Sequence, residues 1–211
     1  MQVSAREAAK TPAEEGSKRR QIIEGARKLF LAQGFDAASM GEIARQAGVS
    51  KGTLYVYFDS KERLFEAVVE DERSGQAEQV FRLDHEDHDV EAVLNRLGKA
   101  FVEFLCQPSG ISPLRTVMAI AERMPEVGRS FYEAGPMCGM ARLGAYLDAQ
   151  VDARVLTIED TEVAAAQFLD SCQSTMFKPL LFNAGGAPSE ERVAYVVGIA
   201  VRTFLAAYQR R

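Results

Sequence analysis

The chain has 211 residues, of which 47% are hydrophobic and 26% charged, a composition that supplies enough apolar material for a globular core. It contains no apolar run of about 18 residues, so the sequence predicts no transmembrane helix. Residues 1–15 are polar and mixed in charge, unlike a signal peptide, and we therefore expect a cytoplasmic protein.

The net charge of −5 conceals an asymmetry along the chain. Residues 1–61 contain ten Lys and Arg against seven Asp and Glu, whereas the remaining residues contain fifteen against twenty-three. Binding to DNA needs only a local basic surface, because the electrostatic contribution comes from charges close to the phosphates. The asymmetry therefore favours a DNA-binding N-terminal part followed by an acidic body.

The apolar residues recur at helical spacing almost throughout, and neither a strand-like alternation nor an Asn-Gly or Asp-Gly hairpin turn occurs. The sequence thus predicts an all-α fold of about nine helices. Residues 1–17 are expected to form a polar, mobile arm. A first helix should follow over residues 18–33 and end at Gly34.

Short, well-capped helices come next in the chain. Ser39 and Glu42 have the spacing of a capping box, and Ser50 and Ser60 stand where the N-caps of two further helices belong. Gly48 permits a tight turn between the first two of these helices. Together these signals predict a helix-turn-helix over residues 39–61.

The second helix of this motif divides into an inner and an outer face. Leu54 and Phe58, four residues apart, are predicted to face the core together with Ile43, Ala44 and Ala47. The side chains left pointing outward are those of Lys51, Gly52, Thr53, Tyr55 and Tyr57. A helix N-terminus carries free amides and a positive dipole end, which suit contact with phosphates or base edges.

The remaining chain reads as a series of helices interrupted by prolines and glycines. His85 and His88 lie in an acidic connector over residues 84–89, which we interpret as a solvated loop rather than a metal site because no third ligand group is evident. Pro108, Gly110 and Pro113 are expected to precede a sixth helix, and Pro125 to start the next. Gly135 and Pro136 should interrupt the chain before an apolar helix that reaches Val151.

Two long helices are predicted at the end of the chain, over residues 160–183 and 189–209. They are apolar around much of their circumference, and a second copy of the chain is the simplest way to bury that surface. Cys106, Cys138 and Cys172 are widely spaced in apolar helical patterns, so we expect buried small hydrophobes, with a thiol sensor as the alternative.

The segment from Ser39 to Lys61 resembles the TetR family of transcriptional regulators. The resemblance rests on the string Ala-Gly-Val-Ser-x-Gly-x-Leu-Tyr-x-Tyr-Phe followed by Ser-Lys, and it covers about residues 18–70. The C-terminal part is similar to the AefR-like subgroup through Leu114-Arg-Thr-Val, Met124-Pro-Glu and Ala164-Ala-Ala-Gln-Phe-Leu169. The resemblance implies a DNA-binding domain over residues 18–62 and a larger helical effector-binding and dimerisation domain over residues 63–211.

The resemblance also implies roles for individual residues. Ser39 and Ser50 would contact phosphates, Lys51, Gly52 and Thr53 would approach base edges in the major groove, and Tyr55, Tyr57 and Lys61 would hold the sugar-phosphate backbone. Amphipathic packing is the alternative for the tyrosines, and ordinary solvation for the lysines. Gly41 stands where the family often has a polar side chain, so one base contact is expected to be missing.

A set of aromatic, methionine and cysteine residues marks the candidate effector pocket: Phe101, Phe104, Met118, Phe131, Met137, Met140, Phe168, Cys172 and Met176. Composition alone favours a plain core for such a set. The resemblance favours an apolar pocket instead.

The resulting hypothesis is a homodimeric repressor, paired through its last two helices, that reads a near-palindromic operator and is released by a small hydrophobic or aromatic effector. No cofactor and no metal are expected. An enzyme is disfavoured because the sequence has no HExxH, no GxSxG and no P-loop. The alternative is an architectural protein that binds DNA constitutively and without an effector.

Overall fold

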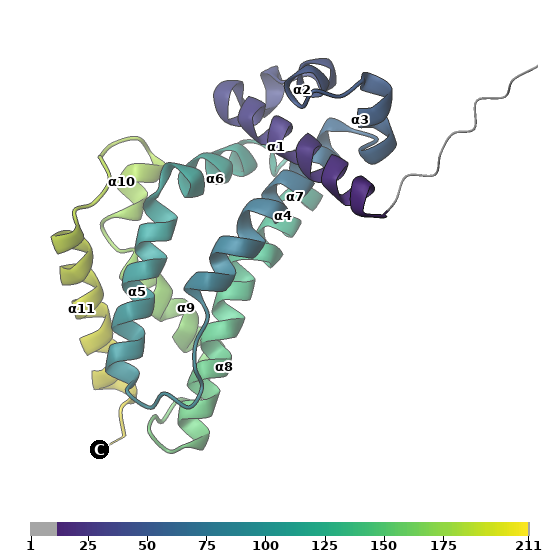
Figure 1. Cartoon of the computed structure of the whole chain (residues 1–211). Coiled ribbons are helices and arrows are strands. Elements are labelled where there is room, and N and C mark those ends of the chain that lie inside the picture. The colour runs from purple at the N-terminus through teal and green to yellow at the C-terminus, as the bar shows by residue number, and fades with distance from the viewer. Residues whose placement is uncertain (1–11, 211) are drawn as a thin grey trace, which may run out of the picture. The chain divides into compact units, whose positions relative to one another are not determined.

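The computed structural model describes residues 12–210, which are mostly helical (Figure 1). Within this range the one β-type pairing is an isolated bridge between Leu156 and Gln209. The predicted all-α fold is therefore confirmed. Among the same residues, no helix combines the length and the apolarity needed to cross a bilayer.

The chain forms two compact units that divide after Asp71. This division lies inside helix α4 (Lys61–Val80), further along the chain than the predicted boundary after residue 62. The reason is that Leu64, Phe65 and Val68, on the first half of α4, are buried. The start of α4 therefore belongs to the core of the first unit.

Helix α1 (Pro12–Ala37) begins earlier than the sequence predicts. Residues 12–17 belong to the helix rather than to an arm, and proline is well tolerated as the first helical residue. Residues 1–11 of the predicted arm lie outside the described range. Gly34 interrupts α1 with a φ of 80°, at the position where the sequence predicts the end of the first helix.

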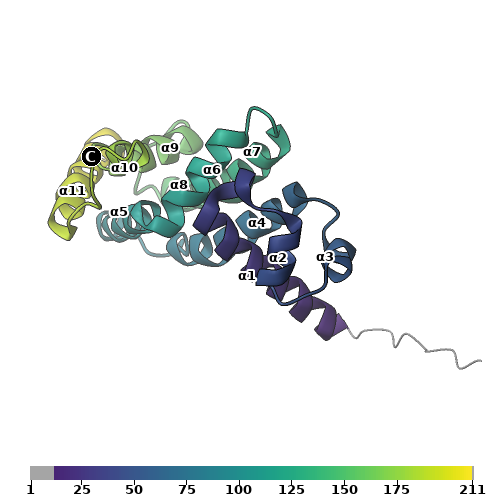
Figure 2. The same ribbon diagram turned by 90° about the horizontal axis from the view of Figure 1, so that it is seen from above.

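Helices α2 (Met40–Gln46) and α3 (Lys51–Tyr57) form the helix-turn-helix expected from the sequence (Figure 2). Ser39 and Glu42 make both bonds of the capping box, Ser50 caps α3, and the Ser60 hydroxyl accepts from the Arg63 amide at the start of α4. Gly48 turns the chain between the two helices with a φ of 65°, a conformation that favours glycine.

The second unit is a bundle in which three helices have an Asp or Ser side chain as N-cap. Its elements are α5 (Val90–Cys106), α6 (Pro108–Ile120), α7 (Pro125–Tyr132), a π-helical turn (Glu133–Met137), α8 (Cys138–Asp152), α9 (Thr161–Cys172), α10 (Phe177–Leu181) and α11 (Glu190–Tyr208). Asp89, Asp160 and Ser189 accept from backbone amides at the starts of α5, α9 and α11.

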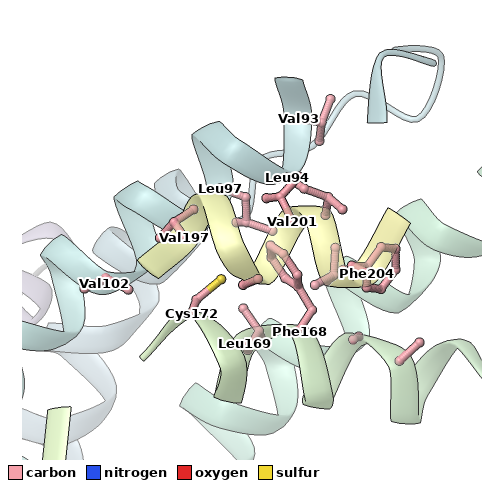
Figure 3. Close-up of a cluster of buried hydrophobic side chains, with 14 of the residues drawn as sticks. Val93, Leu94, Leu97, Val102, Phe168, Leu169, Cys172, Val197, Val201 and Phe204 are labelled. Atoms are coloured by element: carbon pink, nitrogen blue, oxygen red, sulfur yellow. The ribbon is translucent and has the colours of Figure 1, made fainter. Parts of the chain in front are cut away.

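The core of this unit lies where α5, α9 and α11 meet. Figure 3 shows side chains from all three helices converging, among them Leu97, Phe168 and Val201. Gly98 is required there, because a Cβ on it would lie 2.7 Å from Val197 Cγ1 and 3.0 Å from Cys172 Sγ. The absence of a side chain on α5 thus lets α9 and α11 approach closely.

Several helix boundaries differ from those predicted. Helix α6 begins at Pro108 and continues through Pro113, and Gly135 and Pro136 form a π-helical turn that joins α7 to α8. The single helix predicted over residues 160–183 is instead divided into α9 and α10. Thr175 between them has a φ of 66°, and Pro179 cannot donate the amide bond that would continue a helix from residue 175.

The acidic connector over residues 84–89 is held against α8 rather than being only solvated. Gln150, which is fully buried, accepts a hydrogen bond from His88 Nδ1 at 2.8 Å and donates to the His85 carbonyl at 2.9 Å. Because an amide oxygen only accepts, His88 Nδ1 carries the proton. The Tyr146 hydroxyl donates to the Asp87 carbonyl, and burial raises the pKa of that hydroxyl.

Candidate nucleic-acid interface and effector pocket

Helix α3 is fixed from behind by small and apolar residues. Leu54 is fully buried and Phe58 nearly so. Ile43 and Ala44 of α2 and its C-cap, Ala47, are buried as well. Gly25 on α1 crosses α2 so closely that a Cβ there would lie 2.6 Å from the Ala47 Cβ. Gln21 Nε2 donates to the Ala47 carbonyl at 2.7 Å, which satisfies a backbone acceptor at the end of α2. The predicted inner face of the helix-turn-helix is present.

The N-terminus of α3 is closed by a local hydrogen-bond pair. Ser50 Oγ accepts from the Thr53 amide at 3.0 Å and lies 2.8 Å from Thr53 Oγ1. The two predicted contact residues thus bind each other, and Thr53 is half-buried. Gly52 is exposed, with only Ser50 Oγ near the position that a side chain would take, at 3.8 Å. Backbone at this position is open to close approach by a ligand.

The outer face of α3 carries exposed rings and one residue that the sequence reasoning missed. Tyr55 is 52% exposed, Tyr57 is half-buried, and Val56 is 79% exposed. Val56 was overlooked because valine is usually a core residue. Its position could have been found from the helical period, since Val56 is two residues from both Leu54 and Phe58 and therefore points away from them.

Lys51 lies across α2 at Gly41. A Cβ on Gly41 would stand 2.7 Å from Lys51 Cε and 3.0 Å from its Nζ, so a larger residue at position 41 would displace the lysine. The sequence predicts a missing contact at Gly41. In the structure the space left by that missing side chain is occupied by the Lys51 side chain, which is exposed and thus accessible to a ligand.

Lys61 has a different environment from the other predicted contact residues. Its ammonium donates to the carbonyls of Phe35, Asp36 and Ala38 at 2.8, 3.3 and 3.0 Å, and it lies 4.4 Å from the centroid of the Phe35 ring. These contacts use all three donors of the ammonium. They tie the start of α4 to the end of α1, beneath the loop that leads into α2.

Ser39 holds the start of α2. Its hydroxyl donates to Glu42 Oε2 at 2.7 Å, and its own amide donates to the same oxygen at 3.1 Å. These hydrogen bonds lower the pKa of the Glu42 carboxyl below its usual value. Ser39 remains exposed, so it could also meet a phosphate at this helix end.

The second unit encloses a mostly apolar cavity of about 240 Å³. Of the nine residues predicted for an effector pocket, Phe101, Phe104, Phe131 and Met140 line it. Further lining residues include Phe81, Phe177, Asp170 and Gln173, which the sequence reasoning did not select. Phe81 lies in the connector after α4, outside the helices from which the pocket residues were predicted. Asp170 and Gln173 are polar, so a search for apolar and aromatic residues could not identify them.

The other five residues predicted for an effector pocket do not line this cavity. Phe168, Cys172 and Met176 belong to the buried core, where Figure 3 shows Phe168 and Cys172 among the side chains of α5 and α11. Met118 and Met137 are 57% and 45% exposed. Helical periodicity identifies an apolar face but not the neighbour that covers it, so core, cavity and surface residues were grouped together.

The three cysteines differ in accessibility. Burial raises the pKa of the Cys106 thiol, and it raises the pKa of Cys172 to about 12. Both side chains therefore stay protonated and behave as small hydrophobes, as predicted. Cys138, at the start of α8, is half-buried.

Comparison with known proteins places both units in one family. Residues 22–68 match the model of bacterial regulatory proteins of the tetR family, and residues 92–210 match that of the AefR-like transcriptional repressor C-terminal domain. The chain belongs to the TetR family of bacterial transcriptional regulators.

Individual relatives extend this result. A TetR-family regulator from Mesorhizobium loti has a solved structure that superposes with a TM-score of 0.87, at 28% identity, over 95% of this chain and 100% of that one. The Flavonoid-responsive Regulator FrrA superposes with a TM-score of 0.79, at 32% identity, over 93% and 99% of the two chains. The regulator SrpR of Pseudomonas putida is 42% identical over 62 residues, 29% of each chain.

The chain aligns with less than half of the length of the curated TetR-family relatives that it matches. TetR-family proteins are DNA-binding transcriptional regulators, not enzymes, and are typically dimeric repressors. The predicted membership of the TetR family is therefore confirmed.

Proposed function

We propose that this TetR-family protein is a homodimeric repressor that reads a near-palindromic operator and is released by a small, largely apolar effector. The observation that carries the proposal is the outer face of α3, which leaves Lys51, Gly52 and Tyr55 exposed on a capped helix whose inner face is buried. A single helix of this size spans only a few base pairs, so a two-fold pair of such helices is needed for a specific operator.

Each residue of the interface receives a role in this proposal. Lys51 reads a base edge from its position over Gly41, and Gly52 lets the backbone approach the groove. Ser50 and Thr53 hold the N-terminus of α3 in shape. Their hydroxyls are engaged with each other, so Ser50 contributes to phosphate binding mainly through the amides it exposes at the helix end.

The backbone of the DNA is held by the flanking residues. Ser39 stands at the N-terminus of α2, and Tyr55 and Tyr57 present hydroxyls from α3. Val56 lies between these tyrosines and suits an apolar contact with a thymine methyl group. We assign Lys61 to the support of α1 and α4 instead of to direct phosphate binding, because its ammonium is already engaged with three carbonyls.

The proposed dimer uses the last long helices. Tyr195 and Ile199, one turn apart on α11, are 61% and 41% exposed, and Val163 on α9 is 48% exposed. Large apolar side chains in water on neighbouring turns favour burial against a second copy of the chain. The proposed interface is formed by residues 161–182 and 193–208, which belong to the two C-terminal helices predicted from the sequence.

The cavity of about 240 Å³ supports an effector role, since aromatic side chains from several helices line it. The similarity to FrrA, whose name describes a response to flavonoids, favours an aromatic effector. The dimer can adopt conformations that differ in the distance between its two DNA-binding units. A ligand that binds one of these conformations more tightly would change the fraction of dimers able to bind DNA. An architectural DNA-binding protein without an effector is the second candidate.

Fluorescence anisotropy of labelled upstream DNA tests the proposal. The full-length protein is titrated onto the intergenic region before its own gene and onto a scrambled duplex, with and without aromatic compounds that include flavonoids. The proposal predicts preference for the native duplex and release by at least one aromatic compound. Equal affinity for both duplexes, unaffected by the whole panel, would favour the architectural alternative.

A further inference from the structure

The walls of the cavity are rich in phenyl rings. Phe81, Phe101, Phe104, Phe131 and Phe177 line it, and Phe81 meets Phe101 in a T-shaped contact with centroids 6.0 Å apart. Gly139 makes room for this arrangement, because a Cβ there would lie 2.8 Å from the Phe81 ring. Several phenyl rings around one cavity can make edge-to-face or stacked contacts with an aromatic ligand, and this favours an aromatic ligand over an aliphatic chain.

One edge of the cavity is polar and accepts hydrogen bonds. Asp170 on α9 and Gln173 at the end of that helix both line it, and Gln173 Nε2 donates to Asp170 Oδ1 at 2.8 Å. This bond uses a donor of the glutamine and leaves Asp170 Oδ2 and Gln173 Oε1 as acceptors. The second hydrogen of Gln173 Nε2 is a donor, but the acceptors at this edge outnumber it, so the edge favours a guest with an O–H or N–H group.

Among the residues whose side chains the structure describes, the lining includes no Lys, Arg or His. A carboxylate in the cavity would therefore lose its hydration without gaining a cationic partner, and it would also face the Asp170 carboxylate. The cavity is chemically unsuited to an acid and suited to a phenol or an amine.

The volume limits the size of the enclosed part of the guest. At about 240 Å³ the cavity exceeds the roughly 150 Å³ apolar cavity that takes up benzene in another protein. One or two fused rings therefore fit.

We infer that the effector is a one- or two-ring aromatic compound whose hydroxyl or ammonium group donates to the Asp170–Gln173 edge, and that aromatic carboxylates are rejected. This inference rests on the proposed effector pocket. Asp170 acts as the selectivity residue, and the phenyl rings supply most of the affinity.

Isothermal titration of the full-length protein with four matched probes tests the inference: naphthalene, β-naphthol, β-naphthylmethylamine and β-naphthoate. We expect the naphthol and the amine to bind about fivefold more tightly than naphthalene, as a hydrogen bond to a partly solvated carboxylate allows. The naphthoate should bind at least about tenfold more weakly than the naphthol, because its charge gains no cationic partner among the described lining residues and faces the Asp170 carboxylate.

Variants at Asp170 identify the contact. Asp170→Ala should remove the advantage of the naphthol and of the amine while leaving naphthalene unchanged. Asp170→Asn should retain naphthol binding through its amide oxygen but weaken the amine, which separates a phenolic from a cationic effector. Asp152→Ala, which removes an exposed acid at the end of α8, outside both the cavity and the proposed dimer interface, is the control and should change nothing.

Equal binding of naphthalene and naphthol, tight binding of naphthoate, or a full naphthol advantage in Asp170→Ala would overturn the inference. If none of the four probes bound, both the inference and the effector pocket would be contradicted, while the DNA-binding proposal would be judged separately by its own assay. Donor-selective binding without any change in DNA affinity would support the ligand class and contradict the proposed release mechanism.

Discussion

Replacing Lys61 by alanine deletes the ammonium that joins the start of α4 to the end of α1. Two of its three hydrogen bonds, to the carbonyls of Phe35 and Ala38, are partly buried and contribute about 1 kcal/mol each. The third, to Asp36, is exposed and adds little. The ring of Phe35 adds roughly 0.5–1 kcal/mol. We therefore expect the variant to lose about 2–3 kcal/mol of local stability.

Native-state hydrogen exchange of the full-length protein measures this loss. The opening free energy of the backbone amides in α1 and α2 should fall by about 2–3 kcal/mol in Lys61→Ala. Lys51→Ala is the matched control, because the Lys51 side chain is exposed and should change the same free energy by less than about 0.5 kcal/mol. Protein concentration must be held constant, since a dimer gains stability by mass action.

The salt dependence of DNA binding separates the two roles considered for Lys61. If the Lys61 ammonium stays on the carbonyls in the complex with DNA, the Lys61→Ala variant should show the same slope of log K against log salt concentration as the wild type. A direct phosphate contact would instead lower the slope by about one unit. The supporting role of Lys61 would be refuted if the Lys61→Ala variant kept the hydrogen-exchange protection of the wild type and its salt slope fell by about one unit.

Three further predictions concern other residues. Lys51→Ala should reduce discrimination among operator variants by about 1–3 kcal/mol at the base that Lys51 reads. Gly41→Ala should reproduce part of that loss, because its Cβ would displace the Lys51 side chain. Competition binding that shows an unchanged base preference would contradict the base-reading role of Lys51. Ile199→Glu should convert the proposed dimer to monomers in sedimentation. Met118→Glu, at an exposed apolar position of α6, is the control and should leave the proposed dimer intact. An Ile199→Glu variant that remained dimeric would exclude the α11 surface as the dimer interface. Because the pKa of Cys172 is about 12, iodoacetamide at about pH 8 should leave its thiol unmodified in the folded protein, and mass spectrometry showing rapid alkylation there would contradict its burial.

The parts of the fold that depend on local signals could be predicted from the sequence. The hydroxyls of Ser39, Ser50 and Ser60 each accept a hydrogen bond from the backbone amide three residues further along the chain. Gly34 and Gly48 have the positive φ that a helix end or a tight turn requires. The helix-turn-helix is built almost wholly from such signals. Its inner face followed from the spacing of Leu54 and Phe58, and only the exposed Val56 was overlooked.

The parts that depend on neighbours distant in the sequence could not be predicted. Phe168 and Phe101 have the same apolar character, but one packs in the core and the other lines the cavity, because their helices meet different partners. The break at Thr175 was missed since its apolar flanks continue the helical period across it. The three carbonyls around Lys61 likewise come from a segment more than twenty residues away.

Footprinting of the full-length protein on the intergenic region before its own gene tests the central claim most directly. Two recognition helices in a two-fold dimer predict protection of one near-palindromic site, with half-sites about one or more helical turns apart, and loss of that protection when a donor-bearing aromatic effector is added. Uniform coverage of the duplex without a defined site, insensitive to effectors, would contradict the account.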